Sequence, residues 1–458
     1  MRGSDKVYHR PYHPTFLTKE NDKPYICRLA PSSEGFEAEW LDNSGAAGHT
    51  LYYKKRGADE AVSLAIKDSV VKVTGLDEEC EYEIYIENSN GAKSNARLIR
   101  TSRIPEGTAV INYLHPEDDQ YAFSGHYLCS PSIVRAGCGR IIASMDIYGK
   151  RMAQNLTVLF YSDDDGESWR YLCDLYPFYW SVLFMQGGKL YILGQSTEYG
   201  DLRISSSSDN GETWSAASIL FYGSNVLSDL GGINRAPMPL TRYGGRLWAN
   251  CECGCWVCGH IPGVMSIDEN DDPMIPSNWS FGDFLPFEGE WQAASSGKQG
   301  DTMEGSMVIA PDGKLYNYLR WKIGSYLRLK INTDDPEAAP IFDGIYEAPV
   351  SNSMFKILPY DGKYIMVTNT KSEVSAAKYK SWSYRNVLSV YESEDLRSFK
   401  RILDVVNRED EDATKIGFQY PSVFIEGDML YLMIRSAFNG ANSFHDSNYM
   451  LFAKKKLK

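Results

Sequence analysis

Short hydrophobic runs, and runs in which hydrophobic and polar residues alternate, fill most of this chain, and Gly, Asp, Asn and Pro separate them. Alternation with a period of two residues is typical of a half-buried β-strand, whereas segments with the 3.6-residue period of a helix are scarce here. The pattern therefore predicts an all-β protein. It divides the chain into an N-terminal extension (1–21), a β-sandwich (22–103) and a larger β-domain (104–458).

The β-sandwich is predicted from strands at 36–40 and 50–54 and from a tyrosine that follows a turn. Tyr82 lies six residues after Leu76, which resembles the tyrosine corner of fibronectin type III domains, where the hydroxyl ties a strand to the preceding turn. The resemblance implies a module that spaces or presents a catalytic domain. We assign no chemistry to it.

The larger domain contains a repeated turn. Residues 162–169 and 207–214 both fit the pattern S-x-D-x-G-x-[ST]-W. Their spacing of about 45 residues is the length of one four-stranded propeller blade. In such a turn Asp accepts backbone N–H groups, Gly supplies a positive φ and Trp fills the space between sheets. Degenerate copies at 393–399 and 266–279, and a weaker turn at 332–335, leave room for a sixth blade.

These turns are identified as Asp boxes, also called BNR repeats, and the chain resembles the sialidase-like β-propellers. The resemblance implies a fibronectin type III-like β-sandwich followed by a six-bladed sialidase-like β-propeller that is the catalytic domain. Asp boxes are structural and lie away from the active site in that family. They support the fold, and the function has to be argued from other residues.

Four residues match the sialidase pattern in the right order along the chain. Sialidases resemble retaining glycosidases that use a Tyr nucleophile, activated by a Glu, with Arg side chains that hold the substrate carboxylate. A neutral Tyr avoids the repulsion that a carboxylate nucleophile would meet at an anionic sugar. The resemblance implies Tyr420 as nucleophile, Glu304 as its partner, and Arg320 and Arg385 as substrate-binding residues. Gln419, next to Tyr420 in the same segment, is a further substrate-binding candidate.

The chain also departs from the family. Cys129 stands where the first Arg of the sialidase triad is expected, and Arg435 stands where the family keeps the Glu that orients that Arg. Arg435 is therefore a further substrate-binding candidate. The acid/base position is matched by Asp146, although earlier than expected, and Glu198 at the end of a hydrophobic strand is a second candidate.

Two further side chains could contact a sugar. Trp180 could stack on a pyranose ring or pack in the core. His445 lies beside Asp446 in a polar loop before the final strand, where it could belong to a site or to a turn cap.

The net charge and the hydropathy of the chain limit the kinds of partner and substrate that it can bind. Asp plus Glu number 60 and Lys plus Arg 47, so the net charge of −13 disfavours nucleic acid. No apolar run reaches the roughly 18 residues of a membrane-spanning helix. The aromatic share of 13% suits packed sheets and sugar-binding clefts. We expect an oligosaccharide or polysaccharide substrate, and the oligomeric state stays open.

Nine cysteines cannot form a complete set of disulfides within one chain. Cys251, Cys253, Cys255 and Cys258 lie close together, but their spacing is not that of paired zinc knuckles, and we interpret them as packing residues. Acidic turns such as 163–165 offer oxygen ligands for structural calcium, or are ordinary solvated turns. We therefore predict no cofactor.

The first residues contain no hydrophobic segment of a secretory signal. Together with the unpaired cysteines, this predicts a cytoplasmic protein as the sequence stands. If a native signal has been removed, the protein would instead be secreted or periplasmic.

The sequence thus predicts a retaining exo-glycoside hydrolase that acts on a terminal, acidic sugar or a relative of it. Two alternatives stay open. One is a non-catalytic glycan-binding propeller, which the missing Arg would suit. The other is a uronide lyase in which Tyr420 or His445 removes the proton next to a carboxylate.

Overall fold

The computed structural model describes residues 23–224, 231–256, 259–294 and 302–458. Within these ranges nearly all regular structure is β-strand, which confirms the all-β prediction. The predicted extension 1–21 lies outside the described residues. No helix among the described residues is long and apolar enough to cross a membrane. The three short helices are η1 (Pro276–Asn278), α2 (Gly289–Ala294) and α3 (Glu373–Tyr379).

The N-terminal unit consists of two facing sheets. Their strands are, in order, β1 (Tyr25–Ser32), β2 (Gly35–Leu41) and β5 (Val70–Thr74) in one sheet, and β4 (Val62–Ile66), β3 (His49–Lys55), β6 (Glu81–Asn88) and β7 (Arg97–Arg100) in the other. Trp40 and Tyr82 are buried in the core between them. The Tyr82 hydroxyl accepts the backbone N–H of Asp77 at 3.0 Å, so it ties β6 to the turn before it.

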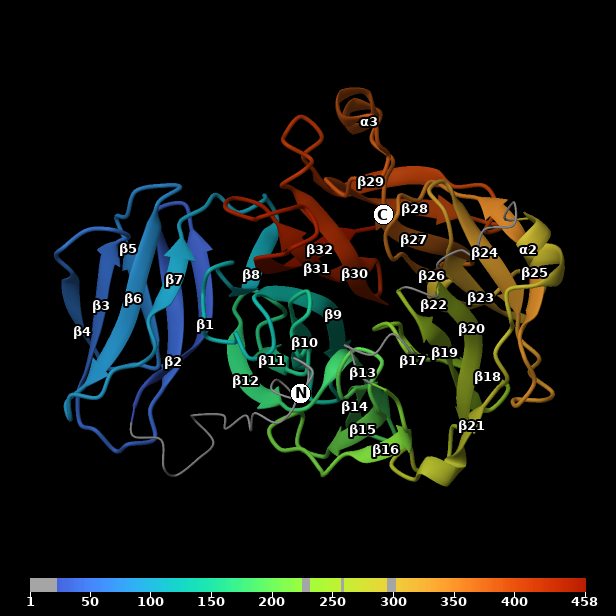
Figure 1. Ribbon diagram of the computed structural model, residues 1–458, viewed down its shortest axis with the longest axis horizontal. Helices are drawn as coiled ribbons and strands as arrows, with labels where there is room; N and C mark the ends of the chain where they lie inside the picture. Colours follow the sequence, from blue (N-terminus) through green and yellow to red (C-terminus); the bar gives the residue numbers. More distant parts are fainter. Residues whose placement is uncertain (1–22, 225–230, 257–258, 295–301) are drawn as a thin grey trace.

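Six further sheets follow along the described chain, and Figure 1 shows their first strands lying toward the middle. We name each sheet after its first strand. The β9 sheet contains β9 (Tyr127–Arg135), β10 (Ile141–Tyr148), β11 (Thr157–Ser162) and β12 (Arg170–Leu175). The β13 sheet contains β13 (Tyr179–Gln186), β14 (Lys189–Gln195), β15 (Leu202–Ser207) and β16 (Ser218–Phe221). The β17 sheet contains β17 (Gly232–Asn234), β19 (Arg246–Cys255), β20 (Gly259–Asp268) and β21 (Trp279–Phe281), with β18 (Thr241–Tyr243) also paired to β19.

In the remaining three sheets, too, neighbouring strands are antiparallel. The β22 sheet contains β22 (Met303–Ile309), β23 (Leu315–Arg320), β24 (Ser325–Lys330) and β25 (Ile341–Glu347). The β26 sheet contains β26 (Lys356–Tyr360), β27 (Lys363–Asn369), β28 (Val387–Ser393) and β29 (Lys400–Asn407). The β30 sheet contains β30 (Gly417–Glu426), β31 (Met429–Ala437), β32 (Tyr449–Lys456) and, as its outermost strand, β8 (Thr108–Tyr113).

Antiparallel order separates the two ends of each sheet. The beginning of the first strand and the loop between the second and third strands lie at one end, and the loop between the third and fourth strands lies at the other. The repeated turns at 162–169 and 207–214 belong to the second kind of loop. In both, Asp accepts the backbone N–H four residues on at 2.9 Å, and the first Ser accepts the Gly N–H at 2.8 Å.

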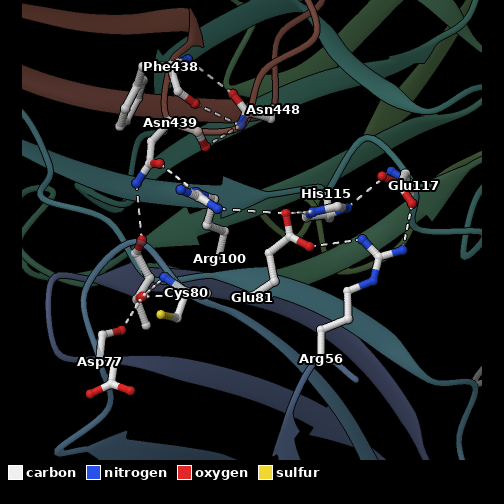
Figure 2. A network of polar contacts seen from close by, with 11 residues as sticks. Arg56, Asp77, Cys80, Glu81, Arg100, His115, Glu117, Phe438, Asn439 and Asn448 are labelled. Carbon is white, nitrogen blue, oxygen red and sulfur yellow. Dashed lines mark hydrogen bonds and ion pairs between the residues drawn. The ribbon is translucent and has the colours of Figure 1, made fainter. Parts of the chain in front are cut away.

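The N-terminal unit packs against the β30 sheet through one continuous hydrophobic core. A polar network rims this contact, in which Glu81 lies 3.7 Å from Arg100 and 3.5 Å from His115, and Arg100 donates to Asn439 at 2.6 Å (Figure 2). Deeper inside, Arg97 and Asp118 form a fully buried ion pair at 2.6 Å. The two units are therefore joined by apolar, polar and charged contacts at once.

Candidate active site

Four first strands bulge at the same place near their beginning. The bulged residues are Ser130, Trp180, Glu304 and Tyr420, with φ angles of 49°, 51°, 60° and 54°. At each of them the pairing with the second strand shifts register. Non-glycine residues rarely adopt the left-handed region, so such positions cluster where the surrounding structure holds them for a purpose.

A pocket of about 800 Å³ opens at this end of the sheets. Five of the side chains predicted from sequence line it: Tyr420, Arg435, Glu198, Trp180 and His445. The loops between second and third strands supply much of its wall, because they lie at the same end of each sheet as the beginning of the first strand. Pocket-lining residues that the sequence analysis did not identify include Tyr148, Lys150, Arg151, Gln154 and Trp256.

Tyr420 is the centre of a buried charged cluster. Arg320 Nη1 donates to the Tyr420 hydroxyl and to Glu304 Oε1, both at 3.1 Å. The same guanidinium lies 3.0 Å from Glu304 Oε2. Because one nitrogen contacts both oxygens, the phenol and the carboxylate are close neighbours. The structure thus brings together Tyr420, Glu304 and Arg320, although Glu304 and Tyr420 lie 116 residues apart in sequence.

Two more guanidinium groups lie against the Tyr420 ring. Arg385 is 5.3 Å and Arg435 5.2 Å from the ring centroid. Burial lowers the pKa of Arg385 to about 10, which leaves it cationic at neutral pH. Arg320 and Arg385 are not among the residues that line the pocket, whereas Arg435 is. Of the three arginines around Tyr420, Arg435 is therefore the one placed to meet a ligand.

Gln419 lies behind the pocket and orients Arg385. Its side-chain oxygen accepts a hydrogen bond from Arg385, and its amide nitrogen donates to the Phe444 carbonyl at 2.6 Å. The Arg385 guanidinium also donates to the Asn352 carbonyl at 2.6 Å. The predicted contact of Gln419 with substrate therefore has no support in the geometry.

Cys129, which stands in the sequence at the place of the first arginine of the sialidase pattern, forms part of the pocket wall. Burial raises the pKa of its thiol to about 12, so this position carries no charge, and the nearby Arg435 acts in the opposite direction. Arg435 donates to the His445 carbonyl at 2.6 Å and lies 5.6 Å from the Tyr148 ring. A guanidinium from β31 thus lies beside the neutral thiol of β9.

Of the two predicted proton donors, one lines the pocket and the other does not. Glu198 lines the pocket, and burial raises its pKa although Trp256 donates to it at 2.7 Å and Gln154 at 3.4 Å. Asp146 is fully buried and is not among the lining residues. It accepts hydrogen bonds from Thr157 Oγ1 at 2.5 Å and from the backbone N–H of Ser181 at 3.2 Å. The structure does not bring Asp146 to the pocket.

Trp180 and His445 complete the predicted set. Trp180 is only 8% exposed, so most of its ring packs in the wall. Burial and the charge of Arg435 lower the pKa of His445 to about 4, while Asp446, 3.0 Å away, acts against this shift. His445 is therefore neutral at ordinary pH.

The cysteine cluster gives no metal centre in the part of the chain that the structure describes. No group of three or more His, Cys, Asp or Glu side chains there is placed to hold a metal ion. Cys251 is buried in the core of the β13 and β17 sheets. Cys258 lies outside the described residues.

Comparisons with known proteins identify the fold. No family model matches the sequence, and no curated protein is similar to it in sequence. The structure is similar to the Hadza microbial sialidase Hz136, with a TM-score of 0.51, 12% identity, and 94% of each chain covered. It is also similar to the leech intramolecular trans-sialidase, with a TM-score of 0.50, 10% identity, and 95% of this chain and 92% of that one covered.

A third similar structure has a different printed activity. The α-L-arabinanase of Penicillium chrysogenum, solved with arabinobiose, has a TM-score of 0.50 and 13% identity, and the match covers 77% of this chain and 99% of that one. At such identities the likeness concerns the fold. The chain therefore has the all-β fold that sialidases and an α-L-arabinanase share.

Proposed function

We propose that this protein is a retaining exo-glycoside hydrolase that acts on a terminal sugar with an acidic group, with Tyr420 as the nucleophile. The observation that carries the proposal is the bridge of Arg320 between Glu304 and the hydroxyl of Tyr420, which is the member of this cluster that lines the pocket. The fold likeness to sialidases and an α-L-arabinanase supports a sugar substrate. A binding protein would have no need for a buried phenol, carboxylate and guanidinium in contact.

The proposed first step uses Tyr420, Glu304 and Glu198. Glu304 accepts the phenolic proton as the Tyr420 oxygen attacks the anomeric carbon. Glu198 donates its proton to the glycosidic oxygen as that bond breaks, and its raised pKa favours the protonated form that this needs. In the second step Glu198 takes a proton from water, the water oxygen replaces the Tyr420 oxygen, and Glu304 returns the proton to the phenol.

The charges around the pocket support an acidic substrate. Arg435 lines the wall, and the exposed side chains of Lys150 and Arg151 line it as well. The carboxyl groups that line it are those of Glu198 and Asp446, so the basic side chains outnumber the acidic ones. Guanidinium groups bind carboxylates with paired hydrogen bonds. A neutral nucleophile also suits an anionic sugar, because it does not repel it.

The finer fold assignment belongs to this proposal too. The six sheets from β9 to β30 would be the blades of a six-bladed propeller, with the repeated turns as Asp boxes. The two N-terminal sheets would be a fibronectin type III-like module within 22–103, ahead of a catalytic domain at 104–458. The Asp77–Tyr82 hydrogen bond supports the tyrosine corner.

The lyase alternative fits the geometry less well. A lyase needs a base in the pocket, and a pKa of about 4 makes His445 a weak one.

The test is Tyr420→Phe, assayed on a panel of aryl glycosides and natural oligosaccharides. We expect kcat/KM to fall about a thousandfold or more, because the nucleophilic oxygen is gone. Tyr431→Phe is the control, since that hydroxyl contacts Asp165 in a repeated turn at the opposite end of the sheets. Undiminished hydrolysis by Tyr420→Phe would refute the nucleophile. Glycan binding by the wild type without any turnover would favour the non-catalytic alternative.

A further inference from the structure

Two buried carboxyl groups occupy equivalent places in the fold. Asp146 lies on β10, the second strand of the β9 sheet, and Glu252 lies on β19, the second strand of the β17 sheet. Both are fully buried, and neither lines the pocket. The mechanism proposed above uses neither of them.

Each carboxyl group contacts the bulge of the next sheet along the chain. Glu252 Oε1 accepts the backbone N–H of Glu304, on β22, at 2.8 Å. Asp146 Oδ2 accepts the backbone N–H of Ser181, next to Trp180 on β13, at 3.2 Å. The same contact therefore recurs between two different pairs of neighbouring sheets.

A bulge needs such a partner. Where the register shifts, a backbone N–H loses its acceptor on the neighbouring strand, and a buried N–H without an acceptor is costly. A left-handed residue adds further strain. A carboxyl oxygen from the adjacent sheet supplies the missing acceptor and fixes the backbone from which the bulged side chain extends.

We propose that Glu252 and Asp146 are positioning residues, Glu252 for Glu304 beside the nucleophile and Asp146 for Trp180 in the pocket wall. The inference rests on the proposed function for its kinetic consequences. It also replaces the acid/base role that the sequence suggested for Asp146.

The surroundings of each carboxyl group indicate whether it holds the bulge in its protonated or its ionised form. Glu252 faces Glu304 on β22 and Arg235 after β17, and it accepts from Asn250 at 2.7 Å on its own strand. Asp146 accepts from Thr157, and Ser130 adds a further hydrogen bond. Burial raises the pKa of Glu252 to about 8 and that of Asp146 to about 7. Both are largely protonated in mildly acidic solution, where an amide of the same shape can replace them.

The kinetic test compares a shape-conserving and an apolar variant at each position. For Glu252→Met we expect kcat to fall about 100-fold with KM within about twofold, because misplaced catalytic groups cost that much. For Asp146→Leu we expect KM to rise about tenfold with kcat nearly unchanged, the equivalent of one lost aromatic contact. Glu252→Gln and Asp146→Asn should stay within about threefold of wild type at pH 6.

The opposite results would overturn the inference. It fails if Glu252→Met is as active as wild type, or if the two apolar variants change kcat and KM in the same way. It also fails if Glu252→Gln is damaged as much as Glu252→Met while both keep the wild-type circular dichroism and cooperative melting.

A structural measurement separates this inference from the proposed function. In a crystal structure of Glu252→Met we expect residue 304 to leave the left-handed region, whereas in Glu252→Gln its φ should stay near 60°. A φ that is unchanged in Glu252→Met would refute the positioning role even if the enzyme is active. A wild type without hydrolytic activity would refute the proposed function and leave this structural result to decide the positioning role.

Discussion

His445 and Glu198 line the same pocket, and burial moves their pKa values in opposite directions. It lowers that of the imidazole to about 4 and raises that of the carboxyl group. In both groups burial favours the uncharged form, because a buried charge loses its hydration. Sequence showed that both residues were polar and near strand ends. It could not show their protonation, because burial comes from residues distant in sequence.

Glu198→Gln tests the proton donor at this scale. We expect kcat/KM to fall about a thousandfold on natural oligosaccharides, whose leaving oxygen needs a proton. On aryl glycosides with an acidic phenol as leaving group the loss in the first step should be much smaller, because that oxygen leaves without protonation. Equal losses on both substrate classes would contradict the assignment and reopen the question of the acid.

At the scale of elements, the repeated turns could be predicted and the bulges could not. A turn such as 162–169 is built from contacts within eight residues, so its sequence pattern suffices. The bulge at Glu304 depends on a carboxyl group 52 positions earlier on another sheet. Asp146 was assigned to catalysis from sequence because a carboxylate near a strand end is visible there, whereas the sheet it faces is not.

The buried carboxyl groups predict how stability changes with pH. Asp146 has a folded-state pKa of about 7, above its ordinary value, so between pH 4 and 7 the folded protein holds a proton that the unfolded chain releases. Its contribution to stability is therefore complete at low pH and declines as pH rises, by at most about 1.4 kcal/mol per pH unit.

Asp146→Asn cannot lose this proton. Relative to wild type, we expect the variant to gain stability as the pH rises from 5 to 7, measured by urea unfolding at each pH. A difference in unfolding free energy that stays constant over this range would contradict the raised pKa. Asp209→Asn, at the exposed repeated turn, is a control in which the pKa is lowered instead.

At the scale of the whole molecule, the N-terminal unit packs on two neighbouring sheets. Arg28 donates to the Val110 and Ile111 carbonyls of β8. Glu39 accepts the backbone N–H of Tyr171, on β12, at 2.8 Å. The resemblance to fibronectin type III domains implies a module that spaces or presents a catalytic domain, and it does not show the contacts between the two units. In the structure the unit shares a hydrophobic core with the β30 sheet.

Asp118→Asn tests whether the units unfold together. It leaves the buried Arg97 without a counter-charge, which should lower the free energy of unfolding by about 3 kcal/mol. We expect one cooperative transition in calorimetry for both wild type and variant. Arg56→Gln, at the rim of the same contact, should cost less than about 1 kcal/mol. Two separate transitions, or no loss in Asp118→Asn, would contradict a joint unfolding unit.

The pairing of β8 with β32 has a consequence for biosynthesis. The ribosome synthesises β8 long before β32, its partner strand. The hydrogen bond between Arg100 and Asn439, which lies beside this strand pair, likewise joins residues 339 positions apart. Until residues 449–456 have been synthesised, the apolar side chains of β8 and of the N-terminal unit cannot pack against β32 and stay exposed to solvent. A nascent or truncated chain that stops earlier therefore presents an open strand edge to chaperones and to other chains.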